Sequence, residues 1–185
     1  MDKTLKRRLE SRLGSYIQGP VRQRYDETEI RIGAGDVQEV LRTVHDAVDL
    51  RFEILADLCG VDTGEQMQVV YHFWSETTKD WLRVIVEGLS REDPRCPSAT
   101  FIWTGAEWLE REAYDMFGIV FEGNRDLRRI FMPADYTSFP LRKDFLLADD
   151  SARSPGAGVR HMERPFSPAV TADDPDAGIR RAPAS

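Results

Sequence analysis

Acidic side chains gather in one short segment, Glu107–Asp115, which holds four carboxylates. On a helix that turns about 100° per residue, Glu107, Arg111 and Asp115 form one polar stripe, which favours solvent-exposed ion pairs. Glu110 falls among the apolar residues instead. An isolated charge is costly to bury, so Glu110 must be paired, protonated or functional.

Two interpretations of Glu110 follow from this position. In the first, it is a general acid or proton relay. In the second, it is a structural anchor for an arginine, because a guanidinium can bind a carboxylate with two hydrogen bonds. The basic residues that could reach it all follow it in sequence: Arg125, Arg128, Arg129, Arg142 and Lys143. We favour the anchor, with Arg128, Arg129 or Arg142 as the partner.

Other chemical groups do not form a recognisable catalytic or cofactor site. Gly33-Ala34-Gly35 lies between a strand pattern and a helix pattern, but Gln38 stands where a dinucleotide-binding turn needs its third glycine. No two histidines have metal-ligand spacing, and two cysteines are too few for a cysteine-ligated zinc or iron–sulfur site. We interpret Cys59 as a small buried side chain rather than a nucleophile.

Composition favours one soluble domain with additional chain. The chain has 185 residues, of which 41% are hydrophobic and 31% charged, and this excludes wholesale disorder. Its net charge of -7 opposes sequence-independent nucleic-acid binding, which needs a basic surface. No apolar run approaches the roughly 18 residues that span a bilayer, and the charged N-terminus is unlike a secretory signal.

Short elements must position the acidic segment. Residues 2–17 predict a charged helix, and a second helix is expected from Asp36 through Val48. A third, Gly105–Phe117, carries the acidic segment and ends with Gly118 at the position after the helix. Four strand patterns are present: 29–32, 51–61, 67–74 and 81–87. The last two should pair as a hairpin, because residues 75–80 are polar and turn-forming.

The order of these elements predicts an α+β fold, with helices packed on a mixed or antiparallel sheet and an extended C-terminal arm. We expect four parts: an N-terminal helix and linker (1–27), the α+β domain (28–121), a basic extended arm (122–150) and a Pro/Ala-rich tail (151–185). The tail holds five of the ten prolines and few large apolar side chains. We therefore expect the tail to be disordered or bound to a partner.

Motifs around and beyond Glu110 resemble those of one family. The sequence WLEREAYDMFGI at 108–119, LRRI at 127–130 and PLRKD at 140–144 is similar to the signature of the C subunit, or 30 kDa subunit, of proton-pumping NADH:quinone oxidoreductase (respiratory complex I). The resemblance covers about residues 28–148. It departs at Asn124, where the family often has histidine, and at 135–139, which differs from the usual segment before PLRKD.

The resemblance implies a cofactor-free member of the hydrophilic peripheral part of the complex. Such a protein packs against the D and B subunits, and the complex carries electrons from NADH through FMN and iron–sulfur clusters to a quinone while translocating protons. It implies a peripheral membrane protein on the cytoplasmic side of the bacterial inner membrane, attached only through the complex, with no nucleic-acid partner.

We predict no catalytic, cofactor-binding or metal-binding residue in the chain itself. The motif residues that we expect at interfaces are Glu110, Arg111, Glu112, Asp115, Gly118, Arg128, Arg129, Pro140, Arg142, Lys143 and Asp144. One alternative is a homologous subunit of a membrane-bound hydrogenase or formate hydrogenlyase, whose downstream blocks tend to diverge from LRRI and PLRKD. A second alternative is a free-standing enzyme that uses Glu110 or Asp115, but no nucleophile or metal motif accompanies these two residues.

Overall fold

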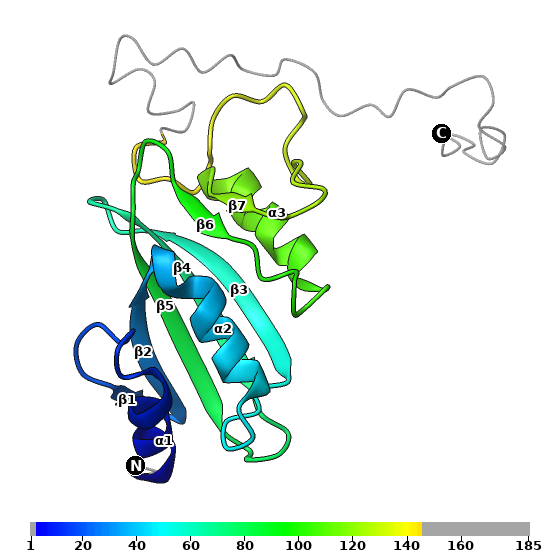
Figure 1. The fold of residues 1–185 in the computed structure, drawn as a ribbon. Coiled ribbons are helices and arrows are strands. Elements are labelled where there is room, and N and C mark those ends of the chain that lie inside the picture. The colour runs from blue at the N-terminus through cyan, green and yellow to red at the C-terminus, as the bar shows by residue number, and fades with distance from the viewer. Residues whose placement is uncertain (1–2, 146–185) are drawn as a thin grey trace, which may run out of the picture. The chain divides into compact units, whose positions relative to one another are not determined.

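Five strands form a mixed sheet in the order β1-β2-β5-β4-β3 (Figure 1). The computed structural model describes residues 3–145. The strands of this sheet are β1 (Arg22–Arg24), β2 (Glu27–Gly33), β3 (Ile54–Asp62), β4 (Met67–Trp74) and β5 (Trp81–Leu89). Only β2 and β5 pair in parallel; the other neighbours are antiparallel. The predicted α+β fold with a mixed sheet is confirmed.

The hairpin of β4 and β5 forms the centre of the sheet. Its register pairs Trp74 with Trp81 across the predicted turn, and their rings lie 5.0 Å apart. Alternate side chains of β4 enter the core because successive residues of a strand point to opposite faces. The core members from β4 are Met67, Val69, Tyr71 and Phe73.

Three helices supply the other side of that core: α1 (Lys3–Leu13), α2 (Val37–Asp46) and α3 (Ala106–Phe117), with a short 3₁₀ turn at Ala34–Asp36 before α2. Leu9 of α1, Val40 of α2 and Ala113 of α3 all join the cluster that includes Tyr71. The helices therefore cover one face of the sheet, as Figure 1 shows for α2 and α3. Within residues 3–145 no helix covers the opposite face, which we call the open face.

A second, two-stranded sheet holds α3 in place. It pairs β6 (Arg95–Pro97) with β7 (Val120–Glu122) in parallel, and these strands flank α3 in sequence. On its other side, α3 packs on β3 so closely that a Cβ at Gly60 would lie 2.6 Å from the Phe117 ring. Phe121 of β7 is buried in the same core as the large sheet.

The structure differs from the sequence-based expectations at several places, which include the unpredicted short strands β6 and β7 and a first helix that ends at Leu13. Helix α2 ends at Asp46, because Ala47 is extended, so Val48 is 82% exposed rather than on a buried face. Cys59 is exposed, because it lies on the edge strand β3 and points away from the core. Within the expected linker, Arg22–Arg24 form β1.

Candidate functional site

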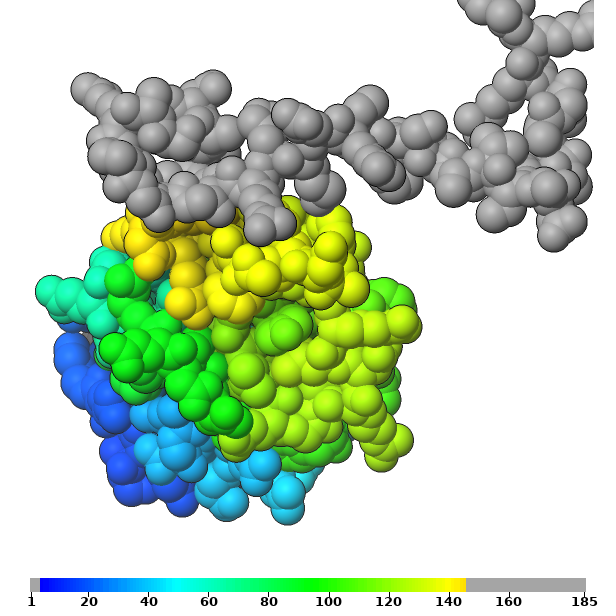
Figure 2. Space-filling model, turned by 90° about the horizontal axis from the view of Figure 1, so that it is seen from above, coloured from blue at the N-terminus to red at the C-terminus, as the bar shows by residue number. Residues whose placement is uncertain are grey.

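The C-terminal arm is described as far as Phe145 and completes the end of α3. Residues 123–145 contain no helix or strand, and Figure 2 shows them (yellow) beside α3 (yellow-green) on one surface. The last carbonyls of a helix have no partner further along it, yet here each one accepts a hydrogen bond. For the carbonyls of Tyr114, Asp115, Met116 and Phe117, the donors are in turn Gly118 N–H, Arg129 Nη1, Leu141 N–H and Arg142 Nε. Arginine side chains are also favoured at this negative end of the helix dipole.

Asp115 is the central acceptor for the arm, and its side chain is fully buried. Its Oδ1 accepts a hydrogen bond from Arg129 Nη1 at 2.7 Å. Its Oδ2 accepts three more from consecutive backbone N–H groups of residues 130–132, at 2.7–3.0 Å. The expected solvent-exposed stripe is therefore wrong at Asp115 and also at Arg111, which is buried, because the arm covers this side of α3.

The charge of Asp115 is stabilised by these donors. Burial alone would raise the pKa of Asp115, but the backbone N–H groups of residues 130–132 and the Arg129 guanidinium together lower it. The carboxylate stays ionised, and the segment 129–132 is fixed around it.

Glu110 is buried as predicted, but the predicted arginine partner is wrong. Its carboxylate accepts hydrogen bonds from Ala99 N–H at 2.6 Å, Ser98 Oγ at 2.8 Å and Asn124 Nδ2 at 2.8 Å. All three donors are neutral, so burial dominates and raises the pKa of Glu110 despite them. Asn124, where the sequence departs from the family pattern, thus ties the start of the arm to α3.

Arg111 holds the next part of the arm through its guanidinium. It donates to the carbonyls of Arg128 at 3.1 Å and Arg129 at 3.5 Å, and it stacks on the Trp108 ring with 4.7 Å to the centroid. Asp126 Oδ2 lies 3.6 Å from Nη1. The guanidinium of Arg128 itself contacts only Asp126 at the surface within the described chain.

The far end of the arm is attached to Asp62, at the end of β3. This buried carboxylate accepts from Lys143 N–H at 2.9 Å, from Gly64 N–H at 2.8 Å and from two nitrogens of Arg91 at 2.8 and 3.1 Å. Burial would raise the pKa of Asp62, but Arg91 and the two N–H groups lower it to about 2. Arg91 also contacts Asp144 at 3.2 Å.

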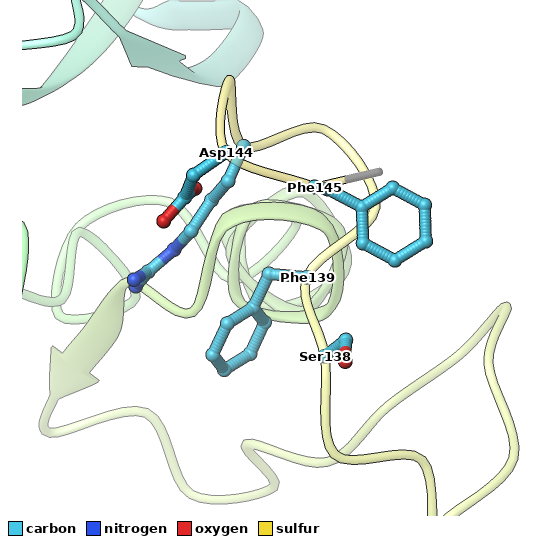
Figure 3. Close-up of a pocket in the computed structure, with 5 residues that line it drawn as sticks. Ser138, Phe139, Asp144 and Phe145 are labelled. Carbon is cyan, nitrogen blue, oxygen red and sulfur yellow. The ribbon is translucent and has the colours of Figure 1, made fainter. Parts of the chain in front are cut away.

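Between these attachments, Phe139 packs against the end of α3. Gly118 adopts φ 75°, and a Cβ there would lie 2.6 Å from the Phe139 ring. Arg142 stacks on the same ring, with 4.6 Å to its centroid, and donates to Arg91 O at 2.9 Å. A small cavity of about 210 Å³ lies here (Figure 3); its lining residues are Ser138, Phe139, Arg142, Asp144 and Phe145.

The structure thus uses most of the predicted interface residues to attach the arm to the rest of the chain. We define the arm seat as the three buried carboxylates Glu110, Asp115 and Asp62 with their donors. Arg111, Gly118, Arg129, Arg142 and Lys143 all serve attachment within the chain, and Pro140 directly precedes a residue that bonds to α3. Glu112 is exposed and makes no hydrogen bond or ion pair with residues 3–145.

No group in the arm seat has the arrangement of a catalytic or metal centre. Within the described chain, no set of three His, Cys, Asp or Glu side chains could hold a metal ion. The thiol nearest Glu110 is Cys96, where burial raises the pKa to about 12, and its Sγ lies 3.6 Å from Tyr71 Oη. None of the helices in residues 3–145 is long and apolar enough to cross a membrane.

Comparison with known proteins shows the family to which this chain belongs. The family model of the 30 kDa subunit of respiratory-chain NADH dehydrogenase matches residues 30–151. The chain belongs to this family. The match includes all three carboxylates of the arm seat and the arm as far as it is described.

Individual proteins that are similar in sequence to this chain support the assignment to the 30 kDa subunit family. The C subunit of NADH-quinone oxidoreductase from Ralstonia pickettii is 39% identical over 151 residues, which cover 77% of this chain and 75% of that protein. The C subunit from Chloroherpeton thalassium is 50% identical over 97 residues, which cover 52% of this chain and 40% of that protein.

Two solved structures share the fold. A trypsin-resistant fragment (1–134) of Nqo5 superposes with a TM-score of 0.57 at 32% identity, covering 67% of this chain and 99% of the fragment. A chain of the membrane-bound sulfane sulfur reductase, an archaeal respiratory membrane complex, gives a TM-score of 0.65 at 26% identity, covering 80% and 87%.

Sequence reasoning missed four residues that complete the arm seat: Asp62, Arg91, Ser98 and Asn124. Ser98 and Asn124 lie outside α3, so the helical projection that predicted the burial of Glu110 does not include them. Asp62 directly follows the strand pattern at 51–61, and this position was the signal available. Arg91 gave no signal that distinguishes it from other surface arginines.

Proposed function

We propose that this member of the 30 kDa family is the cofactor-free C subunit of a proton-translocating NADH:quinone oxidoreductase. Its role is to form interfaces within the peripheral part of that complex. The observation that carries this proposal is the arm seat, in which each of three buried carboxylates accepts at least one hydrogen bond from a segment without regular structure. These hydrogen bonds give the segment a defined surface. A stable interface requires such a defined surface.

The partners that we propose are the D and B subunits. The electron carriers, FMN and iron–sulfur clusters, and the quinone would belong to other subunits of the complex. The complex would place this chain on the cytoplasmic side of the inner membrane.

The proposed contact surface consists of three exposed apolar side chains around the arm: Trp108, Phe131 and Leu141. They are 61%, 65% and 55% exposed, respectively. Aromatic residues that stand at the surface on a rigid support are typical centres of protein interfaces. Trp108 is supported by Arg111, and the backbone of Phe131 is fixed by Asp115.

The test is purification of a tagged chain from membranes, followed by identification of the associated subunits and assay of NADH:quinone activity. Phe131→Asp should reduce recovery of the D and B subunits severalfold. Val48→Asp is the matched control, because Val48 is also exposed but lies far from the arm in sequence. Equal recovery of the D and B subunits with the wild type, Phe131→Asp and Val48→Asp would refute the contact surface. Membership of the complex is tested separately, by whether the wild-type chain recovers these subunits at all.

A second candidate is a subunit of a related membrane-bound respiratory complex or hydrogenase. The likeness to the sulfane sulfur reductase chain favours it. The same purification separates the two, because NADH- and flavin-binding subunits are expected only with the first.

A further inference from the structure

The open face of the sheet concentrates arginines. Side chains alternate between the two faces of a strand, and Ile30 and Ile32 point into the core, so Arg31 between them points to the open face. Arg83 follows by the same reasoning from Val84. In the pairing of β1 with β2, Arg22 lies opposite Glu29, and Glu29 points to the same face as Arg31 because the two are two residues apart on β2. Arg22 therefore also lies on the open face. We define the arginine face as Arg22 and Arg24 of β1, Arg31 of β2 and Arg83 of β5.

These arginines have hydrogen-bond donors that no acceptor within residues 3–145 satisfies. Arg22 and Arg24 are exposed and make no hydrogen bond or ion pair with any residue between 3 and 145. The Nε atoms of Arg31 and Arg83 are buried and have no acceptor within the same residues. Buried donors without an acceptor are rare in proteins, and each calls for a partner group.

The nearby carboxylates are already engaged. Glu29 Oε1 lies 3.2 Å from Arg31 Nη2, and Glu87 bonds to Arg31 Nη1. Glu27 contacts the ring of His72 at 3.0 Å. Although Glu27 and Glu29 lie opposite β1 in the register, neither forms an ion pair with Arg22 or Arg24.

A depression opens among these side chains. Its volume is about 310 Å³, and it is lined by Arg22, Gln23, Arg24, Glu29 and Arg31. Arg31 is paired there with Glu29 and Glu87, but the guanidinium groups of Arg22 and Arg24 have no ion-pair partner within residues 3–145 and remain available to an anion. A guanidinium binds a carboxylate through paired, charge-assisted hydrogen bonds.

The strand that borders the depression is also open to pairing. β1 is the end strand of the sheet, and within residues 3–145 its strand neighbour is β2 alone. An extended segment can add to such an edge through its backbone while its side chains enter the adjacent depression. The ligand that matches both features is an extended run of aspartates or glutamates.

We propose that the arginine face binds an extended acidic segment of a partner protein. This site is independent of the proposed contact surface around the arm, because the arm packs on α3 and α3 lies on the opposite face of the sheet. Either proposal can therefore fail without the other.

The experiment measures binding of a short fluorescent glutamate-rich peptide to the purified full chain by anisotropy at low salt. Arg22→Gln/Arg24→Gln should weaken binding about tenfold, as expected for the loss of two exposed charge pairs. Arg7→Gln/Arg125→Gln is the control: it removes the same charge from exposed arginines that make no hydrogen bond or ion pair in the described chain, and it should change affinity less than about twofold. Thermal unfolding of both variants should match the wild type.

Three results would overturn the proposal. The first is an equal loss of affinity in the two double variants, which would indicate only nonspecific attraction. The second is wild-type binding of a lysine-rich peptide as tight as that of the acidic one. The third is binding of inorganic phosphate at Arg22 and Arg24 without binding of the peptide, which would identify a small-anion site.

Discussion

Three buried carboxylates in this protein share one task but differ in charge environment. Asp115 and Asp62 each face a guanidinium, so their charge is compensated. Glu110 faces only neutral donors, and burial raises its pKa. The distinction matters because removal of one member of a buried ion pair leaves the other charge unpaired, which costs more than the loss of a neutral hydrogen bond.

Asp115→Asn should therefore be the most damaging of the conservative substitutions. It leaves the Arg129 guanidinium unpaired in a buried site, so we expect a loss of about 3–5 kcal/mol in the free energy of unfolding. Glu112→Gln is the control on the same helix, where the exposed charge should matter by less than about 0.5 kcal/mol. Urea denaturation of both variants decides; similar losses would mean that the Asp115 pair adds nothing to stability.

Glu110→Gln should cost less, about 1–3 kcal/mol, because only neutral hydrogen bonds are disturbed. Because burial raises the pKa of Glu110 in the folded protein, the native protein binds the Glu110 proton more tightly than the unfolded chain does. The stabilisation that protonated Glu110 gives is therefore present at low pH and is lost as pH rises. The cost of the substitution should thus be larger at acid pH than at neutral pH. If membranes carrying Glu110→Gln contain a normally assembled complex that fails to turn over, a proton-relay role becomes the better interpretation.

Asp62 should give the opposite pH dependence. Its pKa is lowered from 3.8 to about 2, so it stabilises the fold fully above pH 3.8 and loses this contribution as pH falls toward about 2. The difference in unfolding free energy between wild type and Asp62→Asn should be constant near neutral pH and shrink across that acid range. A difference that stays unchanged down to pH 2 would show that Arg91 and Lys143 do not depend on the Asp62 charge.

At the scale of elements, α3 is covered on two sides rather than one. Its apolar side packs on β3 and the core, and the arm covers the side that carries Arg111 and Asp115. The helical pattern of residues 105–117 predicted the helix, its end at Gly118 and the burial of Glu110. It could not predict the burial of Asp115, because a projection shows which residues are polar and not whether a distant segment covers them.

The same limit explains the other differences in the fold. Strand β4, which has clear apolar alternation, was predicted to the residue, and β2, β3 and β5 were predicted with ends that differ by at most three residues. β1 was missed because its three polar, exposed residues have no alternation to detect. The parallel pairing of β2 with β5 joins residues more than fifty positions apart, and short-range patterns hold no information on it.

Gly118→Ala tests the junction between α3 and the arm. The substitution places a Cβ at positive φ and within 2.6 Å of the Phe139 ring, so we expect a loss of about 2–4 kcal/mol in unfolding free energy. In a Phe139→Ala background the clash with the ring is removed, while Arg142 Nη2 still lies 2.9 Å from the new Cβ, so the loss should fall to about 1–2 kcal/mol. Gly105→Ala, with φ −64° and no atom within 4 Å of the new Cβ, is the control and should be nearly neutral.

At the scale of the whole molecule, residues 3–145 share one core from the first helix to the arm. Leu5, Leu9 and Leu13 of α1 are buried in the cluster against which Leu127 of the arm packs. The four-part division that we expected, with boundaries at 27/28, 121/122 and 150/151, therefore contains parts that depend on one another for burial. The tail at 151–185 lies outside the described residues.

Truncation tests how the stability is distributed. A chain that ends after Phe145 should unfold at the same midpoint as the full chain, because the described core and the arm seat lie within it. In the full chain we expect trypsin to cut from about Ser151 onward in the free protein and to be excluded in the assembled complex, given the tail's five prolines and few large apolar groups. A lower midpoint for the truncated chain, or equal cleavage in both states, would contradict this.

The Asp115 carboxylate also has a consequence for amide hydrogen exchange. The N–H groups of Ile130, Phe131 and Met132 belong to a loop, and loop amides ordinarily exchange with solvent deuterium within seconds to minutes. These three point at a buried oxygen, so their exchange requires local opening of the segment that leads to Phe131. Slow exchange of these three amides would therefore report whether the arm is packed on α3, in a measurement that is independent of any electron-transfer assay.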